Sequence, residues 1–145
     1  MKNLSHIKRA TLIISVTLFL FSLSKDTFCT DNSCNGNWDG IYVLLSGSMG
    51  FFASVAGFSW LANPFILASW ITLKKNRKKS LILSLIATLL SVSFLFFSEV
   101  VKDESGSPRQ ITAHKVGYWL WLSSMIVMVI GNLVLFVRER QQQSV

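Results

Sequence analysis

The chain has 145 residues, of which 51% are hydrophobic and only 14% are charged, against about 25% charged residues in an ordinary soluble domain. The apolar residues form long blocks, because residues 41–73 are free of charge over 33 positions and residues 116–137 over 22. About 20 apolar helical residues cross a bilayer. This composition excludes an ordinary soluble domain and predicts an all-α, polytopic integral membrane protein. We expect one membrane domain, residues 1–145, built as a four-helix transmembrane bundle.

The net charge of +7 does not indicate a protein that binds nucleic acid. Its Lys and Arg residues gather between apolar runs, which is typical of a signal for membrane topology.

The first predicted helix, about residues 7–24, follows the basic residues Lys2, Lys8 and Arg9. A basic start, a short apolar segment and small residues at Ser22 and Ser24 are also typical of a cleavable signal peptide. We favour a retained helix, with cleavage as the alternative. In both cases the next segment lies across the membrane from the N-terminus.

The first outer loop, about residues 25–40, contains the two cysteines of the chain, Cys29 and Cys34. Two cysteines five positions apart in a loop that faces an oxidising compartment predict a disulfide that closes a small ring. The neighbouring Asn, Gly and Asp residues are turn formers. Trp38 is expected to anchor the loop at the lipid headgroups.

Two alternatives for this loop involve chemistry. Residues 31–39 follow part of a calcium-loop pattern, but Tyr42 stands where that pattern needs a bidentate glutamate, so no metal is expected. A cysteine pair in the first outer loop of a four-helix protein is similar in layout to membrane thiol–quinone oxidoreductases. That resemblance implies electron relay through Cys29 and Cys34. It also implies a CxxC-type pair and a further cysteine pair, which this sequence lacks.

The second predicted helix, residues 41–73, is too long for one straight crossing, because 33 helical residues span about 50 Å. We expect a bend near Pro64, since proline lacks an N–H and leaves the carbonyl of Trp60 without its helical donor. Asn63 is placed to satisfy that carbonyl or to bond to a neighbouring helix.

The predicted inner loop, residues 74–79, carries five cations: Lys74, Lys75, Arg77, Lys78 and Lys79. With the N-terminus inside, ten of the 14 Lys and Arg residues lie on the inner side, and this bias sets orientation. We expect both termini in the cytoplasm and residence in the plasma or inner membrane. The cysteine loop and the second outer loop, about residues 102–114, are then on the outer face.

The third and fourth predicted helices, about residues 80–101 and 115–137, carry polar groups suited to helix packing. Gly117, Ser124 and Gly131 recur at steps of seven and allow close approach of a neighbour. The third helix has a hydroxyl stripe, and two amides stand elsewhere in the bundle. The full polar set is Ser80, Ser84, Thr88, Ser91, Asn63 and Asn132. We favour a packing seam, with the lining of a polar path as the alternative.

No set of residues indicates a catalytic site, a cofactor or a metal site. The leading hypothesis is therefore a non-enzymatic accessory, assembly or immunity-type protein that acts through helix and outer-loop contacts. Its expected partners are the lipid bilayer and a membrane protein or a second copy of the chain. The first alternative is a carrier or pore for a small neutral or hydrophobic solute. The second is a thiol oxidoreductase that uses Cys29 and Cys34.

Overall fold

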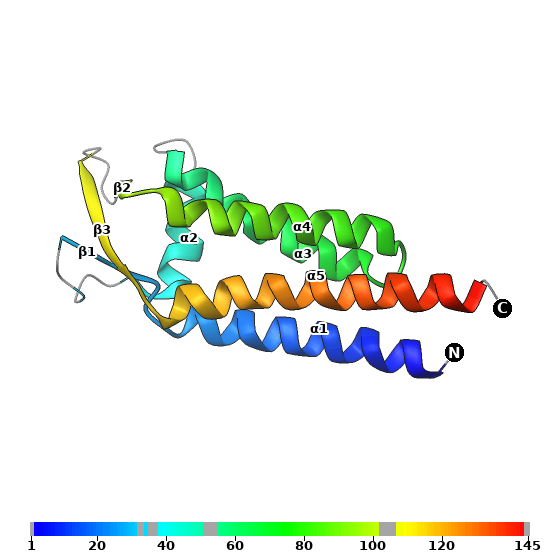
Figure 1. The fold of residues 1–145 in the computed structure, drawn as a ribbon. Helices are drawn as coiled ribbons and strands as arrows, with labels where there is room; N and C mark the ends of the chain where they lie inside the picture. Colours follow the sequence, from blue (N-terminus) through cyan, green and yellow to red (C-terminus); the bar gives the residue numbers. More distant parts are fainter. Residues whose placement is uncertain (1, 32–33, 35–37, 51–54, 102–106, 144–145) are drawn as a thin grey trace.

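The computed structural model describes residues 2–31, 34, 38–50, 55–101 and 107–143 and is mostly helical, at 76%. In chain order the elements are α1 (Lys2–Leu23), β1 (Phe28–Thr30), α2 (Gly40–Gly50), the 3₁₀ helix η1 (Val55–Leu61), α3 (Ala62–Thr72), α4 (Arg77–Ser93), the 3₁₀ helix η2 (Phe94–Phe96), β2 (Glu99–Val101), β3 (Pro108–His114) and α5 (Val116–Gln143). The long helices fill most of the chain, and the short strands come from the segment after α1 and from the segment between α4 and α5 (Figure 1).

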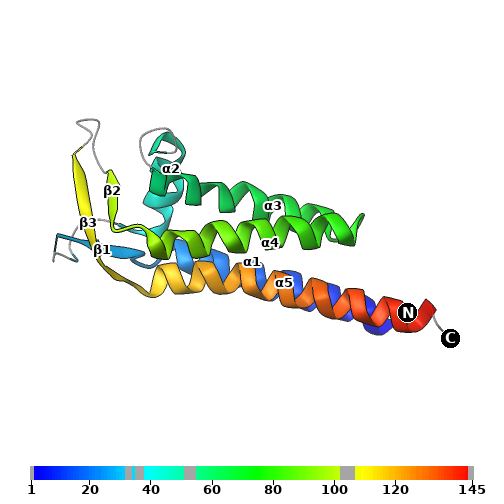
Figure 2. The ribbon, with the colours of Figure 1, turned by 45° about the horizontal axis from the view of Figure 1, so that its top comes forward.

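Helices α1, α3, α4 and α5 run side by side along one axis (Figures 1 and 2). The three strands lie at one end of this bundle, and both termini and the α3–α4 turn lie at the other. Among the described residues, three helical segments are long and apolar enough to cross a membrane: Leu4–Leu23, Arg77–Phe96 and Val116–Gln141. These segments fit the predicted all-α class and indicate a membrane protein.

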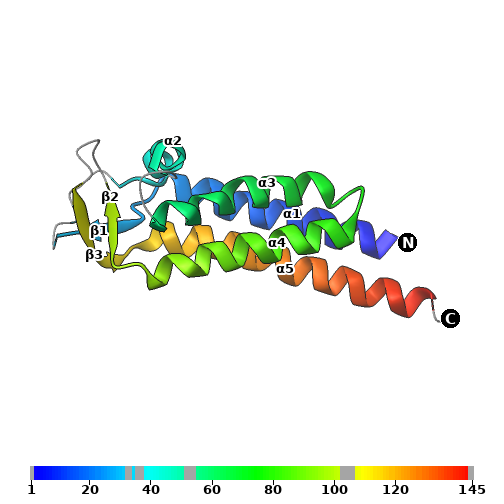
Figure 3. The ribbon, with the colours of Figure 1, turned by 90° about the horizontal axis from the view of Figure 1, so that it is seen from above.

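The prediction of one bent helix over residues 41–73 is wrong. The structure divides this stretch into α2, η1 and α3, with residues 51–54 outside the described part. Helix α2 runs across the long helices and is seen end-on in Figure 3. The indole N–H of Trp60 donates to the Leu44 carbonyl at 2.8 Å and ties η1 to α2. The stretch is too long for one crossing, and its first part, α2, therefore lies across the end of the bundle.

Pro64 lies in the first turn of α3, next to the junction with η1. The first turn of a helix has N–H groups without helical partners, so a proline there costs α3 no bond. The Asn63 amide donates to the Trp60 carbonyl at 3.0 Å. This is one of the two roles that the sequence suggested for Asn63.

Segments of the two predicted outer loops form a three-stranded antiparallel sheet in the order β1-β3-β2, where the sequence predicted loops and a helix end. Phe28 pairs with His114 across β1 and β3, and Glu99 pairs with Gln110 across β2 and β3. The predicted helix 80–101 thus stops early, with Glu99–Val101 in a strand. Each strand is short, and its partner is far away in sequence, so local patterns could not reveal the pairing.

The stripe of small residues on α5 faces α1 and the residues that directly follow α1. Gly117 approaches the backbone so closely that a Cβ there would lie 2.6 Å from the carbonyl oxygens of Lys25 and Asp26. A Cβ on Gly131 would overlap the side chain of Thr11, and Ser124 accepts a hydrogen bond from Ser15. The spacing of seven therefore corresponds to a real line of helix–helix contact.

Replacing Gly131 with Leu should lower the free energy of unfolding by about 1–3 kcal/mol, because the new side chain overpacks the contact with Thr11. Thermal unfolding in detergent micelles, followed by circular dichroism, measures the effect. Ile130→Leu is the matched control, since Ile130 is 55% exposed on the neighbouring position. Equal melting temperatures for the two variants would contradict this close contact.

Candidate functional site

Hydrogen bonds between side chains and backbone cross the bundle at several levels. Ser15 of α1 donates to the Ser124 carbonyl of α5 at 2.7 Å and accepts from the Trp70 indole of α3 at 2.9 Å. The Trp121 indole of α5 donates to the Asn63 amide oxygen of α3 at 2.8 Å. These bonds connect α1, α3 and α5 through groups that lipid could not satisfy.

A second set of bonds joins α3, α4 and α5 at the level of Ser80. The Ser69 hydroxyl donates to the Ser80 carbonyl and the Ser80 hydroxyl to the Ser69 carbonyl, both at 2.9 Å. The Asn132 amide lies 3.1 Å from the Ser80 hydroxyl and 3.4 Å from that of Ser84. The Asn132 side-chain oxygen is buried and has no hydrogen-bond partner among the described residues. The structure thus brings together three of the six polar residues that the sequence singled out.

The remaining polar residues are placed differently. Thr88 donates to the Ser84 carbonyl of its own helix, and Ser91 donates to that of Thr88. The Tyr118 hydroxyl of α5 reaches the Ser91 carbonyl at 2.9 Å. Asn63 bonds with Trp121 and Trp60, so it belongs to a separate contact from Asn132. The Thr88 and Ser91 hydroxyls therefore bond within α4, and the contact of α4 with Tyr118 uses a backbone carbonyl.

At the sheet end, the disulfide between Cys29 and Cys34 is present, with Cα atoms 4.6 Å apart. Asp31, directly beyond β1, accepts from the Arg109 guanidinium at 2.9 Å and from the Gln110 backbone N–H at 3.2 Å. The Arg109 hydrogen bond lowers the pKa of Asp31 below its ordinary value. The disulfide and the ion pair thus act on the same turn. Residues 32–33 and 35–37 of the rejected calcium pattern lie outside the described part.

Trp38 is 6% exposed and packs inside the protein, which corrects the expectation that it anchors the loop in the headgroups. Its ring lies 4.5 Å from that of Phe28, and its indole donates to the Thr30 hydroxyl at 3.1 Å. The Trp38 carbonyl accepts from the backbone N–H of Thr27 at 3.0 Å. Trp38 therefore packs against β1 through Phe28 and Thr30.

His114 ends β3 against two aromatic rings. Its ring centroid lies 5.7 Å from that of Phe94 and 4.9 Å from that of Tyr118. The Nε2 atom is buried with no hydrogen-bond partner among the described residues. Burial lowers the pKa of His114 below its ordinary value of 6.5.

At the opposite end, the basic α3–α4 turn lines an open hollow of about 600 Å³ together with α1 and α5. Lys8 comes from α1, and Phe136, Glu139 and Arg140 come from α5. Sequence reasoning placed these charges on one side of the membrane but did not predict that they surround a common space. The packing of α5 against both α1 and α4 brings them to the turn.

The comparisons with known proteins add no relative. No protein-family model matches the sequence, and no curated protein and no solved structure is significantly similar to the chain. Functional inference therefore depends on the described contacts.

The sheet should lose stability as the pH falls below about 6.5, the ordinary pKa of histidine. Because the folded pKa of His114 is lowered, the stabilisation is complete above the unfolded pKa of 6.5 and is lost as the pH falls toward the folded value. Hydrogen exchange of the β1 and β3 amides measures the loss. His114→Gln, which does not titrate, should remove this dependence. The same pH dependence in the variant would show that another group causes it.

Proposed function

We propose that this chain is a small multi-pass membrane protein that acts through contact with a membrane protein or a second copy of itself, without chemistry of its own. Two features support this. Interior hydrogen-bond donors, among them the Ser15 hydroxyl, the Trp121 indole and the Asn132 amide N–H, are engaged in bonds between helices. The two outer loops form one ordered sheet. The pairing of these loops is the observation that carries the proposal, because it builds a polar surface from segments about 80 residues apart.

We further propose four crossings, with η1 and α3 together as the second. Seven 3₁₀ residues at about 2.0 Å and eleven α-helical residues at about 1.5 Å span about 30 Å, which matches the hydrocarbon core. The termini and the basic turn share one end, and the disulfide loop occupies the other (Figure 1). Both features favour cytoplasmic termini and an outward sheet, in the plasma or inner membrane.

Labelling with a membrane-impermeant maleimide tests this orientation. In a background with Cys29 and Cys34 replaced by Ser, Thr112→Cys should react in intact cells, because Thr112 is exposed on β3. Lys78→Cys should react only after the membrane is permeabilised. Reaction of both positions from the same side would refute the orientation.

The exposed part of β3 offers the contact surface. Pro108, Arg109 and Gln110 are exposed, and Thr112 and Ala113 continue the exposed stretch toward the bundle. The Asp31–Arg109 ion pair and the disulfide hold β1 beside this strand. A partner would therefore meet a preformed surface and would not have to order two loops.

The bonds of the hydroxyl stripe favour this proposal over a carrier. Ser84, Thr88 and Ser91 each donate to a carbonyl of their own helix, and Ser80 and Asn132 bond across helices. A polar path would need such groups to face a solute. Here their donors are already used, so a solute would have to compete for them.

A photo-crosslinking amino acid at Thr112 should yield one protein adduct of defined mass in native membranes. A second copy would give twice the 16.3 kDa of the chain. The matched control is the same residue at Leu89, which is 69% exposed on α4 and should yield lipid adducts. Arg109→Gln should weaken the Thr112 adduct, because it releases Asp31.

The outcome that would overturn the proposal is the absence of a protein adduct at Thr112 together with solute flux in liposomes. In that case Ser84→Leu combined with Thr88→Leu should abolish the flux, and the chain would be a carrier.

A further inference from the structure

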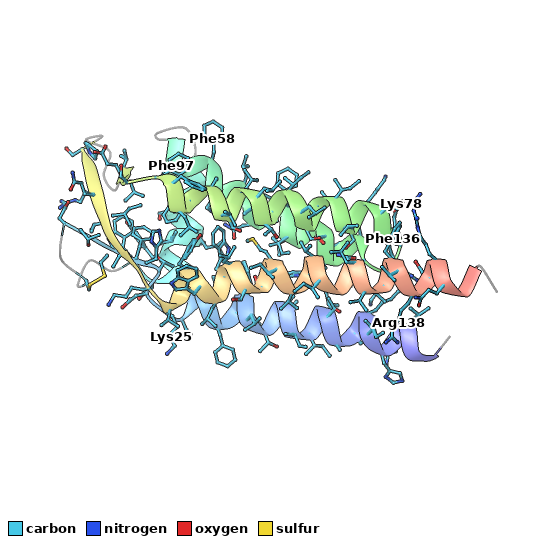
Figure 4. All side chains as sticks on the ribbon, viewed as in Figure 1. Lys25, Phe58, Lys78, Phe97, Phe136 and Arg138 are labelled. Carbon is cyan, nitrogen blue, oxygen red and sulfur yellow. A yellow bond between two sulfur atoms is a disulfide. The ribbon has the colours of Figure 1, made fainter. Side chains whose placement is uncertain are left out.

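Cationic side chains from three separate elements surround the hollow at the end of the bundle that holds both termini. Figure 4 shows Lys78 and Phe136 there, on α4 and α5. The lining residues are Lys8, Lys74, Lys75, Asn76, Arg77, Lys78, Phe136, Glu139 and Arg140. Six of these nine residues are cations. A topology signal alone needs positive charge on this side of the membrane but does not need it to converge on one space.

The charges around the hollow are poorly compensated. Glu139 is the one carboxylate among the lining residues, and it forms an ion pair with Arg77. Five cations therefore have no carboxylate partner within the lining. Their mutual repulsion is relieved when an anion enters the space between them.

Two further features suit the hollow to an anion with several oxygens. The Arg140 guanidinium carbon lies 4.5 Å from the centroid of the Phe136 ring, and this cation–π contact holds the charge at the wall of the hollow. Helix α4 begins at this wall, with the Asn76 side chain as its N-cap and no acid in its first turn. The positive end of the helix dipole therefore adds to the side-chain charge.

We propose that this hollow binds a phosphate-bearing anion. The chemistry that it recognises is a phosphate with free oxygens, which a lipid headgroup or a soluble phosphate supplies. Lys8 and Arg140 approach the anion from α1 and α5. Lys74 and Lys75 approach it from the α3–α4 turn, and Lys78 approaches it from the start of α4. A volume of about 600 Å³ accommodates such a group with its first water molecules. This site goes beyond the proposed contact function and lies at the other end of the molecule from the sheet.

Native mass spectrometry of the full chain in a neutral detergent tests the proposal. The probes are dioctanoyl phosphatidic acid, dioctanoyl phosphatidylcholine and inorganic phosphate. Phosphatidic acid should bind saturably with one molecule per chain, and phosphatidylcholine should not. Displacement of the lipid by millimolar inorganic phosphate would assign the site to soluble phosphates, and retention of the lipid would assign it to headgroups.

The decisive variant is Lys8→Gln combined with Arg140→Gln, which leaves the basic turn intact. Each cation beside an anionic group is worth about fivefold in affinity, so this variant should bind phosphatidic acid about 25-fold more weakly. Lys79→Gln combined with Arg138→Gln removes the same charge from exposed positions that do not line the hollow, and it should bind as the parent does.

If the first variant fails to fold, Lys75→Gln combined with Lys78→Gln removes two exposed cations of the same hollow and should give the same loss. Equal losses in the lining and control variants would overturn the proposal. So would a parent protein that retains neither phosphatidic acid nor phosphate.

Discussion

Lipid gives a polar group nothing to bond with, and this constraint explains the interior of the bundle. A soluble core can leave a serine or an indole to a nearby water, whereas these groups must find partners within the protein, on their own helix or on a neighbouring one. Ser15 meets Trp70 and Ser124, and Asn63 meets Trp121. Bonds of this type are worth about 0.6 kcal/mol on average. Their importance here is directional, because each one fixes how one helix is rotated against another.

Because of the same constraint, part of this interior could be predicted from the sequence. The all-α class, the line of small residues through Gly131 and the bond from Asn63 to the Trp60 carbonyl follow from apolar length, spacing and the missing N–H of Pro64. The path of residues 41–73 could not be predicted in this way, because an uninterrupted apolar sequence has the same pattern whether it spans a membrane or lies across a bundle. The position of α2 beside η1 depends on tertiary contacts such as that of Trp60 with Leu44.

The two ends of the molecule show what a local pattern cannot predict. The disulfide of Cys29 and Cys34 needs only two nearby residues and was predicted, but the ion pair of Asp31 and Arg109 joins positions 78 apart. The basic turn was likewise predicted as a charge run, whereas its hollow also needs Lys8 and Arg140. Pairings between distant segments are set by topology, and a single sequence without periodic signals contains no trace of them. Trp38 was misplaced for this reason, because its burial depends on strands from both loops.

The position of β3 at the centre of the sheet fixes an order of events during synthesis. Strand β1 and both cysteines leave the ribosome long before β3, and the disulfide closes a ring between residues only five positions apart. Oxidation of the first loop therefore does not have to wait for the rest of the polypeptide. The ladder between Phe28 and His114 does have to wait until α4 and the whole of β3 have been synthesised. A nascent chain arrested before Arg109 would thus hold a closed ring beside a strand β1 whose partner has not yet been made.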